Sequence, residues 1–299
     1  MDQNRSWKIA GESSMKEDRI HTWLNHSPGR VRRGIVVVLA ALVCCGAMAS
    51  AQTASAPRLA TPVRIAAAAD LQPVLPPVLR AFEQETGIHV TATYESSAAL
   101  TAQMLNGAGF DLFLSADMSY PRKIIAAGLG ASAEPIPYAH GVLVLFTRRD
   151  SRWPQPTMEL LRDPGLKRLA IADPARAPYG HAAMATLTNL GVGAALQPKL
   201  VTAANIAQAA QFAETGNADA GLISQTAAVT PALRSVGSFI VVPQRLYPVI
   251  EQGAVVLAKS AERVNAQRML DFLRSPEMQR QLQQSGLNPI AGATRQPAR

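Results

Sequence analysis

The sequence predicts an α/β protein of two lobes, each a mostly parallel sheet flanked by helices, with two segments that cross between the lobes. Three observations support this fold class. Residues 63–104 read as strand, turn, helix, strand, turn, helix, and a second set of this kind begins at Leu169. Two apolar strands, 141–147 and 253–257, are suited to carry the chain out of the first lobe and back.

The first 51 residues predict a secretory signal peptide with an overlong N-terminal region. Arginine-rich residues 30–33 precede an apolar run, 34–48, that is short for a membrane span, and the small residues 49–51 supply a cleavage signal. We therefore expect export to the periplasm. An uncleaved membrane anchor is the alternative.

Cysteine usage and charge exclude several classes of function. Both cysteines, Cys44 and Cys45, fall inside the leader, so the exported part has no disulfide, thiolate metal site or cysteine nucleophile. The leader holds seven Lys/Arg and four Asp/Glu, so the rest of the chain keeps +5 of the total net charge of +8. This mild charge, without a basic cluster interleaved with aromatic residues, argues against a nucleic-acid partner.

The first lobe is predicted from residues 62–138 and 251–299, after a flexible Ala/Ser/Thr/Pro stub at 52–61. Gly87 and Gly128 are expected to end two of its helices. Its predicted strands cover 63–68, 89–94, 112–114 and 253–257, and its predicted helices cover 71–82, 98–104, 120–127, 261–273 and 276–285.

The second lobe is predicted from residues 139–250 and repeats the pattern of the first. A loop at 173–180, with two prolines and a terminal glycine, joins the predicted strand 169–172 to the helix that starts at His181. The predicted strands cover 141–147, 169–172, 199–201, 221–223 and 239–243, and the predicted helices cover 181–189, 206–214 and a segment starting at 224.

Several predicted helices begin where a strand ends, at small or polar residues. Asp70 and Ser97 stand at two such turns in the first lobe, and Tyr179 and Ile206 stand at helix starts in the second. Because parallel strands joined by helices bring these turns to one sheet edge, the helix starts should converge. Their unpaired N–H groups and positive dipole ends favour an anion, and a hinge between two lobes can enclose a small one.

Blocks of residues between 63 and 287 resemble the periplasmic molybdate-binding proteins of ABC importers, a branch of the two-lobed type II solute-binding fold. The most specific are Asp-Leu-Phe-Leu-Ser-Ala-Asp at 111–117 and Asp-Pro-x-x-x-Pro-x-Gly at 173–180. Weaker blocks lie at 66–71, 94–100, 205–209 and 221–224.

The resemblance implies a site that holds a tetrahedral dianion with hydroxyl and main-chain N–H groups, and without Lys or Arg. Carried over by motif, the expected ligand-binding residues are Asp70, Ser97, Tyr179, Ile206 and Ser224, with Ala69 and Ser96 in support. The metal enters only as its oxyanion, so no side chain is expected to ligate a cation directly. No cofactor is expected.

Asp70 departs from the family pattern, which usually has a hydroxyl or amide side chain at this position. A carboxylate facing a dianion would repel it. We therefore expect Asp70 to turn away and cap its own helix, while the N–H groups of the turn bind the ligand. If the carboxylate faces the cleft instead, it favours a protonated oxyanion. Pro73, Pro76 and Pro77 are expected to distort the opening turn of the helix.

These features predict a substrate-binding component of an ABC importer rather than an enzyme, with molybdate and also tungstate as ligands. The expected partners are the oxyanion and a membrane permease, and the chain is expected to be a monomer. One alternative is a binding protein for another oxyanion such as sulfate. The other is an exported serine hydrolase using Ser97, His181 and Asp70, although no Gly-x-Ser-x-Gly motif surrounds Ser97.

Overall fold

The computed structural model describes residues 61–290. The predicted leader, all but the last residue of the predicted stub, and residues 291–299 lie outside the described residues. The described chain forms two sheets of five strands each, and we call each sheet with its helices a lobe. Within residues 61–290, no helix is long and apolar enough to cross a membrane.

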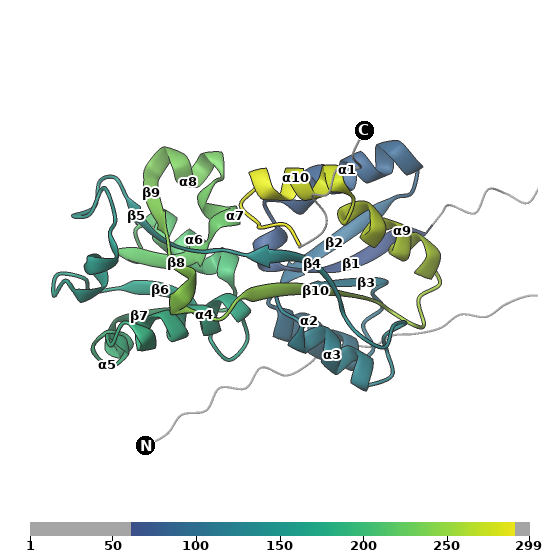
Figure 1. Ribbon diagram of the computed structural model, residues 1–299, viewed down its shortest axis with the longest axis horizontal. Coiled ribbons are helices and arrows are strands. Elements are labelled where there is room, and N and C mark those ends of the chain that lie inside the picture. The colour runs from purple at the N-terminus through teal and green to yellow at the C-terminus, as the bar shows by residue number, and fades with distance from the viewer. Residues whose placement is uncertain (1–60, 291–299) are drawn as a thin grey trace, which may run out of the picture. The chain divides into compact units, whose positions relative to one another are not determined.

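Lobe 1 is built on a mixed sheet with the strand order β2-β1-β3-β10-β4. Strands β2, β1 and β3 are parallel, and β10 runs antiparallel to both β3 and β4. In Figure 1, helices α1, α9 and α10 cover one face of this sheet, and α2 and α3 cover the other. The strands are β1 (Val63–Ala68), β2 (Val90–Glu95), β3 (Leu112–Ser115), β4 (Ile136–Gly141) and β10 (Ile250–Val256), and the helices are the 3-10 turn η1 (Ala69–Leu71), α1 (Leu75–Thr86), α2 (Ser97–Leu105), α3 (Ser119–Ala126), α9 (Arg263–Leu273) and α10 (Pro276–Gln284).

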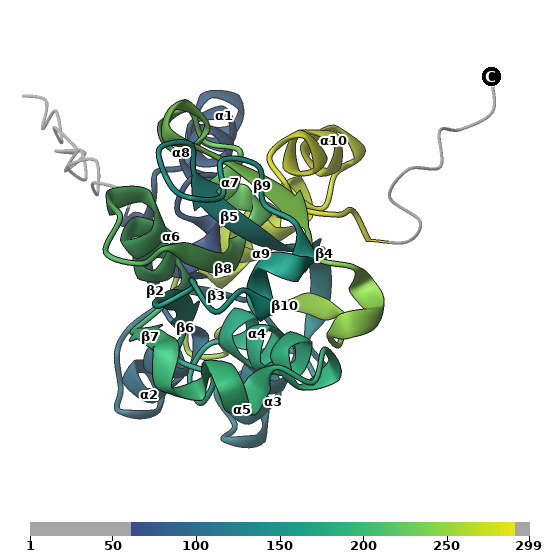
Figure 2. The ribbon, with the colours of Figure 1, turned by 90° about the vertical axis from the view of Figure 1, so that its left-hand side faces the viewer.

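Lobe 2 repeats this plan with the strand order β7-β6-β8-β5-β9. Strands β7, β6 and β8 are parallel, and β5 is antiparallel to β8 and β9. Figure 2 looks onto this lobe, with α7 and α8 above the sheet and α4 and α5 below it. The elements are β5 (Leu143–Arg148), η2 (Met158–Arg162), β6 (Leu169–Ala172), α4 (Pro178–Asn189), α5 (Gly193–Leu196), η3 (Gln197–Lys199), β7 (Leu200–Ala203), α6 (Ile206–Thr215), β8 (Ala220–Ser224), α7 (Gln225–Ala228), α8 (Pro231–Val236), β9 (Gly237–Val241) and η4 (Gln244–Leu246).

The chain passes from the first sheet to the second between β4 and β5, and it returns between β9 and β10. The three parallel strands of each sheet therefore come from one continuous stretch of the chain. The antiparallel strands β5 and β10 are the first strands after the two crossings. The lobe boundaries at 138/139 and 250/251 stay predictions.

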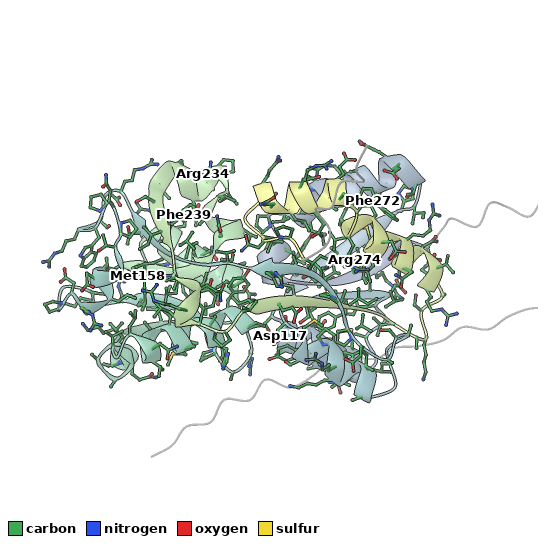
Figure 3. The ribbon with its side chains drawn as sticks, in the orientation of Figure 1. Asp117, Met158, Arg234, Phe239, Phe272 and Arg274 are labelled. Atoms are coloured by element: carbon green, nitrogen blue, oxygen red, sulfur yellow. The ribbon has the colours of Figure 1, made fainter. Side chains whose placement is uncertain are left out.

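Apolar side chains cover both faces of the first sheet. One buried cluster joins alternate residues of β1, such as Val63 and Ile65, to α1, α9 and α10. Phe272 of α9, labelled in Figure 3, packs edge to face against Phe82 of α1 with ring centroids 5.4 Å apart. A smaller cluster around Phe113 fills the other face, under α2 and α3. The sheet edge that carries the helix starts is thereby fixed from both sides.

Prolines shape the first helix. The prediction of a helix through 71–82 is wrong at its start, because a 3-10 turn covers Ala69–Leu71 and α1 begins only at Leu75. Pro76 and Pro77 occupy the first turn of α1, where a missing N–H costs nothing. The distortion expected from the prolines is therefore present.

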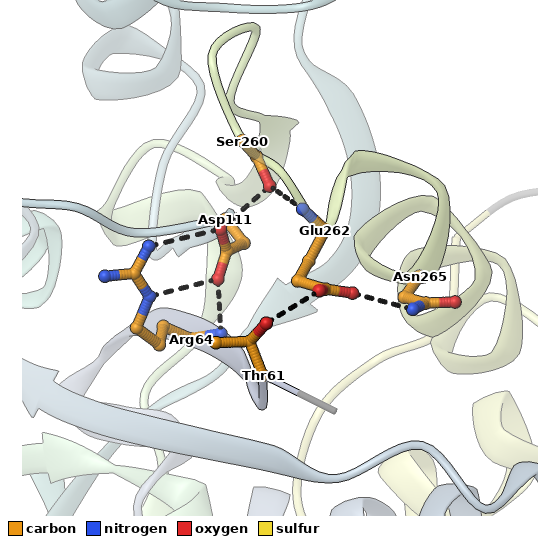
Figure 4. A network of polar contacts seen from close by, with 6 residues as sticks. All are labelled: Thr61, Arg64, Asp111, Ser260, Glu262 and Asn265. Atoms are coloured by element: carbon orange, nitrogen blue, oxygen red, sulfur yellow. Dashed lines mark hydrogen bonds and ion pairs between the residues drawn. The ribbon is translucent and has the colours of Figure 1, made fainter. Parts of the chain in front are cut away.

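A polar network closes the end of lobe 1 where β1 begins (Figure 4). The buried Asp111 carboxylate accepts hydrogen bonds from the backbone N–H of Arg64 at 2.7 Å and from the Ser260 hydroxyl at 2.8 Å. Ser260 in turn accepts from the N–H of Glu262 at 3.0 Å. One carboxylate thus ties β1 and the chain before β3 to the chain before α9.

Candidate functional site

The structure brings the predicted site residues to the contact between the two lobes. The turn η1, which holds Ala69 and Asp70, packs against α6 and α7 of lobe 2. Ala69 also shares one buried apolar cluster with Tyr179 and Ile206, together with Ala116 of lobe 1. Residues far apart in the sequence therefore meet at a single boundary.

The start of α2 presents two serines with different roles. Ser96 has an extended backbone, and its hydroxyl accepts from the N–H of Ala99 at 3.2 Å, which makes it the N-cap expected of serine. Ser97 is buried, and its hydroxyl accepts from the N–H of Ala116 at 3.1 Å. Since a hydroxyl both accepts and donates, this bond orients Ser97 and leaves its hydrogen for another acceptor.

The start of α6 supplies main-chain donors from lobe 2. Asn205 is its N-cap, with the side-chain oxygen accepting from the N–H of Gln208 at 3.0 Å. Ile206 is the first residue of α6 and is buried. Its N–H belongs to the first turn, which has no acceptor within the helix, so it can donate to a ligand.

The two helix starts are linked across the lobes by the carboxylate of Glu95. Its Oε2 accepts from the N–H of Ser96 at 3.3 Å and from the Asn205 side-chain amide at 3.2 Å. Beside it, the carbonyl of Arg176 in lobe 2 accepts from the N–H of Ala98 at 3.3 Å. In this structure acceptors of the protein itself therefore use donors at the start of α2.

Tyr179 and Asp70 join the lobes directly. The structure places Tyr179 in the first turn of α4, which begins at Pro178 and not at His181 as predicted. Its buried phenol donates to Asp70 Oδ2 at 3.1 Å, and the Gln252 side-chain amide of β10 donates to the same oxygen. The tyrosine hydroxyl is thus committed to a carboxylate of the opposite lobe.

The expectation that Asp70 caps its own helix is wrong. Ala68 precedes η1, and no side chain caps this turn. Asp70 instead accepts from partners that are 109 and 182 residues away in the chain. A buried carboxylate without hydrogen-bond donors is costly, so it pairs with whatever donors the fold brings close. Here these donors are tertiary partners and not the N–H groups of its own turn.

The Asp70 carboxyl is buried, and no Lys, Arg or His within residues 61–290 forms an ion pair with it. Burial raises the pKa of Asp70 from its ordinary 3.8 to about 6, although the hydrogen bonds from Gln252 and Tyr179 act to lower it. Burial, and then the neighbouring Asp70, hold the pKa of the Tyr179 hydroxyl well above its usual range. Asp70 Oδ1 and Gln252 Oε1 are both buried and have no hydrogen-bond partner among residues 61–290.

A cavity of about 780 Å³ opens next to this contact and takes its walls from both lobes. Of the predicted residues, it includes Ala69 and Ser224 but not Asp70, Ser97, Tyr179 or Ile206. Its polar lining comes from Gln72, Glu95, Asn205, Gln208, Gln211, Glu214, Ser224 and Thr230. No lysine or arginine of the described part of the chain lines it.

Ser224 is the last residue of β8 and the N-cap of α7. Its buried hydroxyl oxygen accepts from the N–H of Ala227 at 3.4 Å and from the Thr226 hydroxyl at 2.9 Å. These contacts lie within lobe 2, so Ser224 forms part of the cavity wall through its local structure.

The residue types of a serine hydrolase triad are not assembled. His181 is exposed on α4 and lines a separate cavity of about 400 Å³ with Asp117 and Tyr120. Ser97 is hydrogen bonded to a backbone N–H, and Asp70 pairs with Tyr179. Across the described residues, no group of three or more His, Cys, Asp or Glu is placed to hold a metal ion.

Sequence reasoning did not identify Glu95 or Gln252 as site residues. Glu95 directly follows the predicted strand 89–94 and precedes the Ser-Ser pair, so its place near a helix start could be inferred from the sequence. Gln252 lies on β10, and only the antiparallel pairing of β10 with β3 and β4 brings it to Asp70. No pattern among the residues next to Gln252 predicts its contact with Asp70.

Comparison with known proteins finds relatives that match most of the described chain. The family model of the bacterial extracellular solute-binding proteins matches residues 63–288. The molybdate-binding protein ModA of Rhodobacter capsulatus is 41% identical over 66% of this chain and 76% of its own length, and ModA of Azotobacter vinelandii is 34% identical over 82% and 92%.

A solved structure of the Azotobacter vinelandii periplasmic molybdate-binding protein superposes with a TM-score of 0.72 at 28% identity, covering 76% of this chain and 99% of that one. The matched region spans both five-stranded sheets. The chain therefore belongs to the bacterial extracellular solute-binding protein family, among the relatives of the molybdate-binding protein ModA.

Proposed function

We propose that this protein binds molybdate, and tungstate with it, between its two lobes, and passes it chemically unchanged to the permease of an ABC importer. Two ModA relatives at 41% and 34% identity support the ligand class. The proposed contacts are the Ser97 hydroxyl, the N–H of Ile206 and the N–H groups of the turn at Ala69 and Asp70, with Tyr179, Ser96 and Ser224 around them.

The observation that carries this proposal is the meeting of two helix starts from opposite lobes. Glu95 accepts hydrogen bonds at both starts at once, from Ser96 and from Asn205. A main-chain N–H at the start of α2 and the side-chain amide of the α6 N-cap thus share one carboxylate oxygen. The free N–H groups of these two helix starts can bind a small dianion in the same region, since anion binding at helix starts needs no lysine or arginine.

Neutral donors also explain a preference among oxyanions. Molybdate is fully ionised at neutral pH, whereas phosphate carries a proton that needs an acceptor. A site made only of donors leaves that O–H unmatched, at a cost of about 1–3 kcal/mol. The size of the closed site would then separate molybdate from the smaller sulfate.

Capture between the lobes fits a hinged protein with two connecting segments, for which we propose boundaries at 138/139, which lies within β4, and at 250/251, at the start of β10. The hydrogen bonds between Tyr179 and Asp70 and between Ala98 and Arg176 span the two lobes. Contacts of this kind are remade when such a protein opens and closes around its ligand. We further propose export to the periplasm after cleavage of the leader near residue 51, and a monomeric chain.

Isothermal titration of the mature chain with molybdate, tungstate, sulfate and phosphate tests the proposal. We expect heat with molybdate and tungstate, and Ser97→Ala should weaken molybdate binding by about 10- to 100-fold, the worth of one hydrogen bond to a charged group. Ser132→Ala is a matched control, because that hydroxyl donates to the carbonyl of Glu134 on the surface of lobe 1. Heat with sulfate and none with molybdate would contradict the proposed ligand.

A further inference from the structure

Asp70 and Gln252 form a planar carboxyl beside a planar amide with one hydrogen bond between them. The Gln252 Nε2–H donates to Asp70 Oδ2. The remaining oxygen of each group, Asp70 Oδ1 and Gln252 Oε1, is buried and has no partner among the described residues. Two buried acceptors without donors in one hydrogen-bonded pair are costly, because each loses its water without gaining a donor.

A single proton removes both deficits. Placed on Asp70 Oδ1, it turns that acceptor into a donor and supplies the hydrogen that Gln252 Oε1 lacks. Carboxylic acid and primary amide then pair through two hydrogen bonds, with no net charge buried. The Tyr179 hydroxyl keeps its bond to Oδ2 in either state, so the contact between the lobes is preserved.

Hydrogen bonds from Gln252 and Tyr179 favour the charged form of Asp70, but burial outweighs them, and among residues 61–290 no cation forms an ion pair with this carboxyl. The nearest titratable groups are phenols: Tyr179 on α4 and Tyr138 on β4 are buried, and both have a pKa raised by burial and by Asp70. Of the elements α6, α7 and β2, which pack against η1, β2 and α6 carry acidic groups, and these repel a carboxylate. The titratable groups on the surrounding elements are Arg64 on β1, Tyr94 and Glu95 on β2, Glu214 on α6, His181 on α4, His140 on β4 and Glu251 on β10, with none on α7.

We propose that Asp70 takes up one proton, shared with Gln252, when the oxyanion binds, so that the dianion meets a neutral acid–amide pair. This inference rests on the proposed function for its ligand. Proton uptake allows a chain with a carboxylate at this position to bind a dianion. The proton comes from solvent, and Asp70 ends as the neutral acid.

The consequence is binding that depends on pH. Above the pKa of Asp70 in the free protein, about 6, each molecule of molybdate bound carries one proton with it. Kd should then rise about tenfold for each unit of pH, until the pKa of Asp70 in the complex is reached. Asp70→Asn keeps the shape and removes the titration, so its Kd should change less than about twofold over the same range.

Titration calorimetry at about pH 7.5 in buffers of different ionisation enthalpy measures the proton directly. The wild-type chain should take up close to one proton per molybdate, Asp70→Asn close to none, and Asp150→Asn the wild-type number. Asp150 is the matched control because it is a surface aspartate whose pKa is lowered by its hydrogen bond with Arg148.

Infrared spectroscopy of the molybdate complexes of the wild type and of Asp70→Asn gives a second readout. The wild type should show the C=O stretch of a protonated carboxyl that is missing from Asp70→Asn. Molybdate binding without proton uptake and without this band would overturn the acid–amide pair and leave the proposed function standing. Failure of the wild-type chain to bind any oxyanion at any pH would overturn both.

Discussion

Replacing Asp70 by asparagine should stabilise the ligand-free protein at neutral pH. The unfolded chain holds Asp70 at an ordinary pKa of 3.8, whereas burial raises its pKa in the folded protein to about 6. For an acid whose pKa is higher in the folded state, the free energy of unfolding is greatest below about pH 3.8, where both states are protonated. It falls as the pH rises from about 3.8 and has fallen fully once the pH is above about 6. At about 1.36 kcal/mol per pKa unit, the loss is about 3 kcal/mol.

Asparagine avoids this loss because it does not ionise, and its side-chain oxygen still accepts from Tyr179. The free energy of unfolding should therefore be measured for both proteins by urea denaturation at about pH 4 and pH 7. The advantage of Asp70→Asn over the wild type should grow by about 2 kcal/mol between the two, because a small part of the loss has already occurred at pH 4. The surface variant Asp150→Asn should show no gain of this kind. An equal difference between wild type and Asp70→Asn at both pH values would refute the burial of an unbalanced carboxyl.

Three further substitutions test other contacts. Gly141→Ala would place a methyl group against the Tyr179 phenol. Molybdate binding measured by calorimetry should therefore weaken at least tenfold while the fold is kept. Unchanged affinity would mean that Tyr179 has room to move. Glu95→Gln removes a negative charge that bridges the helix starts, and it should tighten molybdate binding by about two- to tenfold, most clearly at low salt; weaker binding would show that the charge is needed. Asp111→Ala should lower the free energy of unfolding by about 3 kcal/mol through loss of its bonds to Arg64 and Ser260, with the affinity of the folded protein unchanged; a stability like that of the wild type would contradict the role of this network.

Much of the fold was predictable because the order of apolar and polar residues within short segments indicates its strands and helices. Alternation and apolar runs marked the three parallel strands of each sheet, and serine or asparagine before an apolar run marked the starts of α2 and α6. The strand β4 was missed, since Pro137 and Gly141 interrupt its pattern and its pairing with β10 is remote in sequence.

The part of the site that could not be predicted depends on contacts between distant segments. In the sequence, Asp70 has the pattern of a helix cap, because it follows a strand and stands directly before an apolar run with helical spacing. Its actual partners, Tyr179 and Gln252, come from the other lobe and from the returning strand. Only the assembled fold decides between a local cap and a tertiary hydrogen bond of similar strength.

The central claim is that neutral donors of both lobes hold one oxyanion. A crystal structure of the molybdate complex, with molybdenum located by its anomalous scattering, tests it most directly. We predict one molybdenum between the lobes, with the Ser97 hydroxyl and the Ile206 N–H within hydrogen-bond distance of its oxygens and no lysine or arginine in contact. Molybdate held by basic side chains, or bound to a single lobe away from Ser97 and Ile206, would contradict the account.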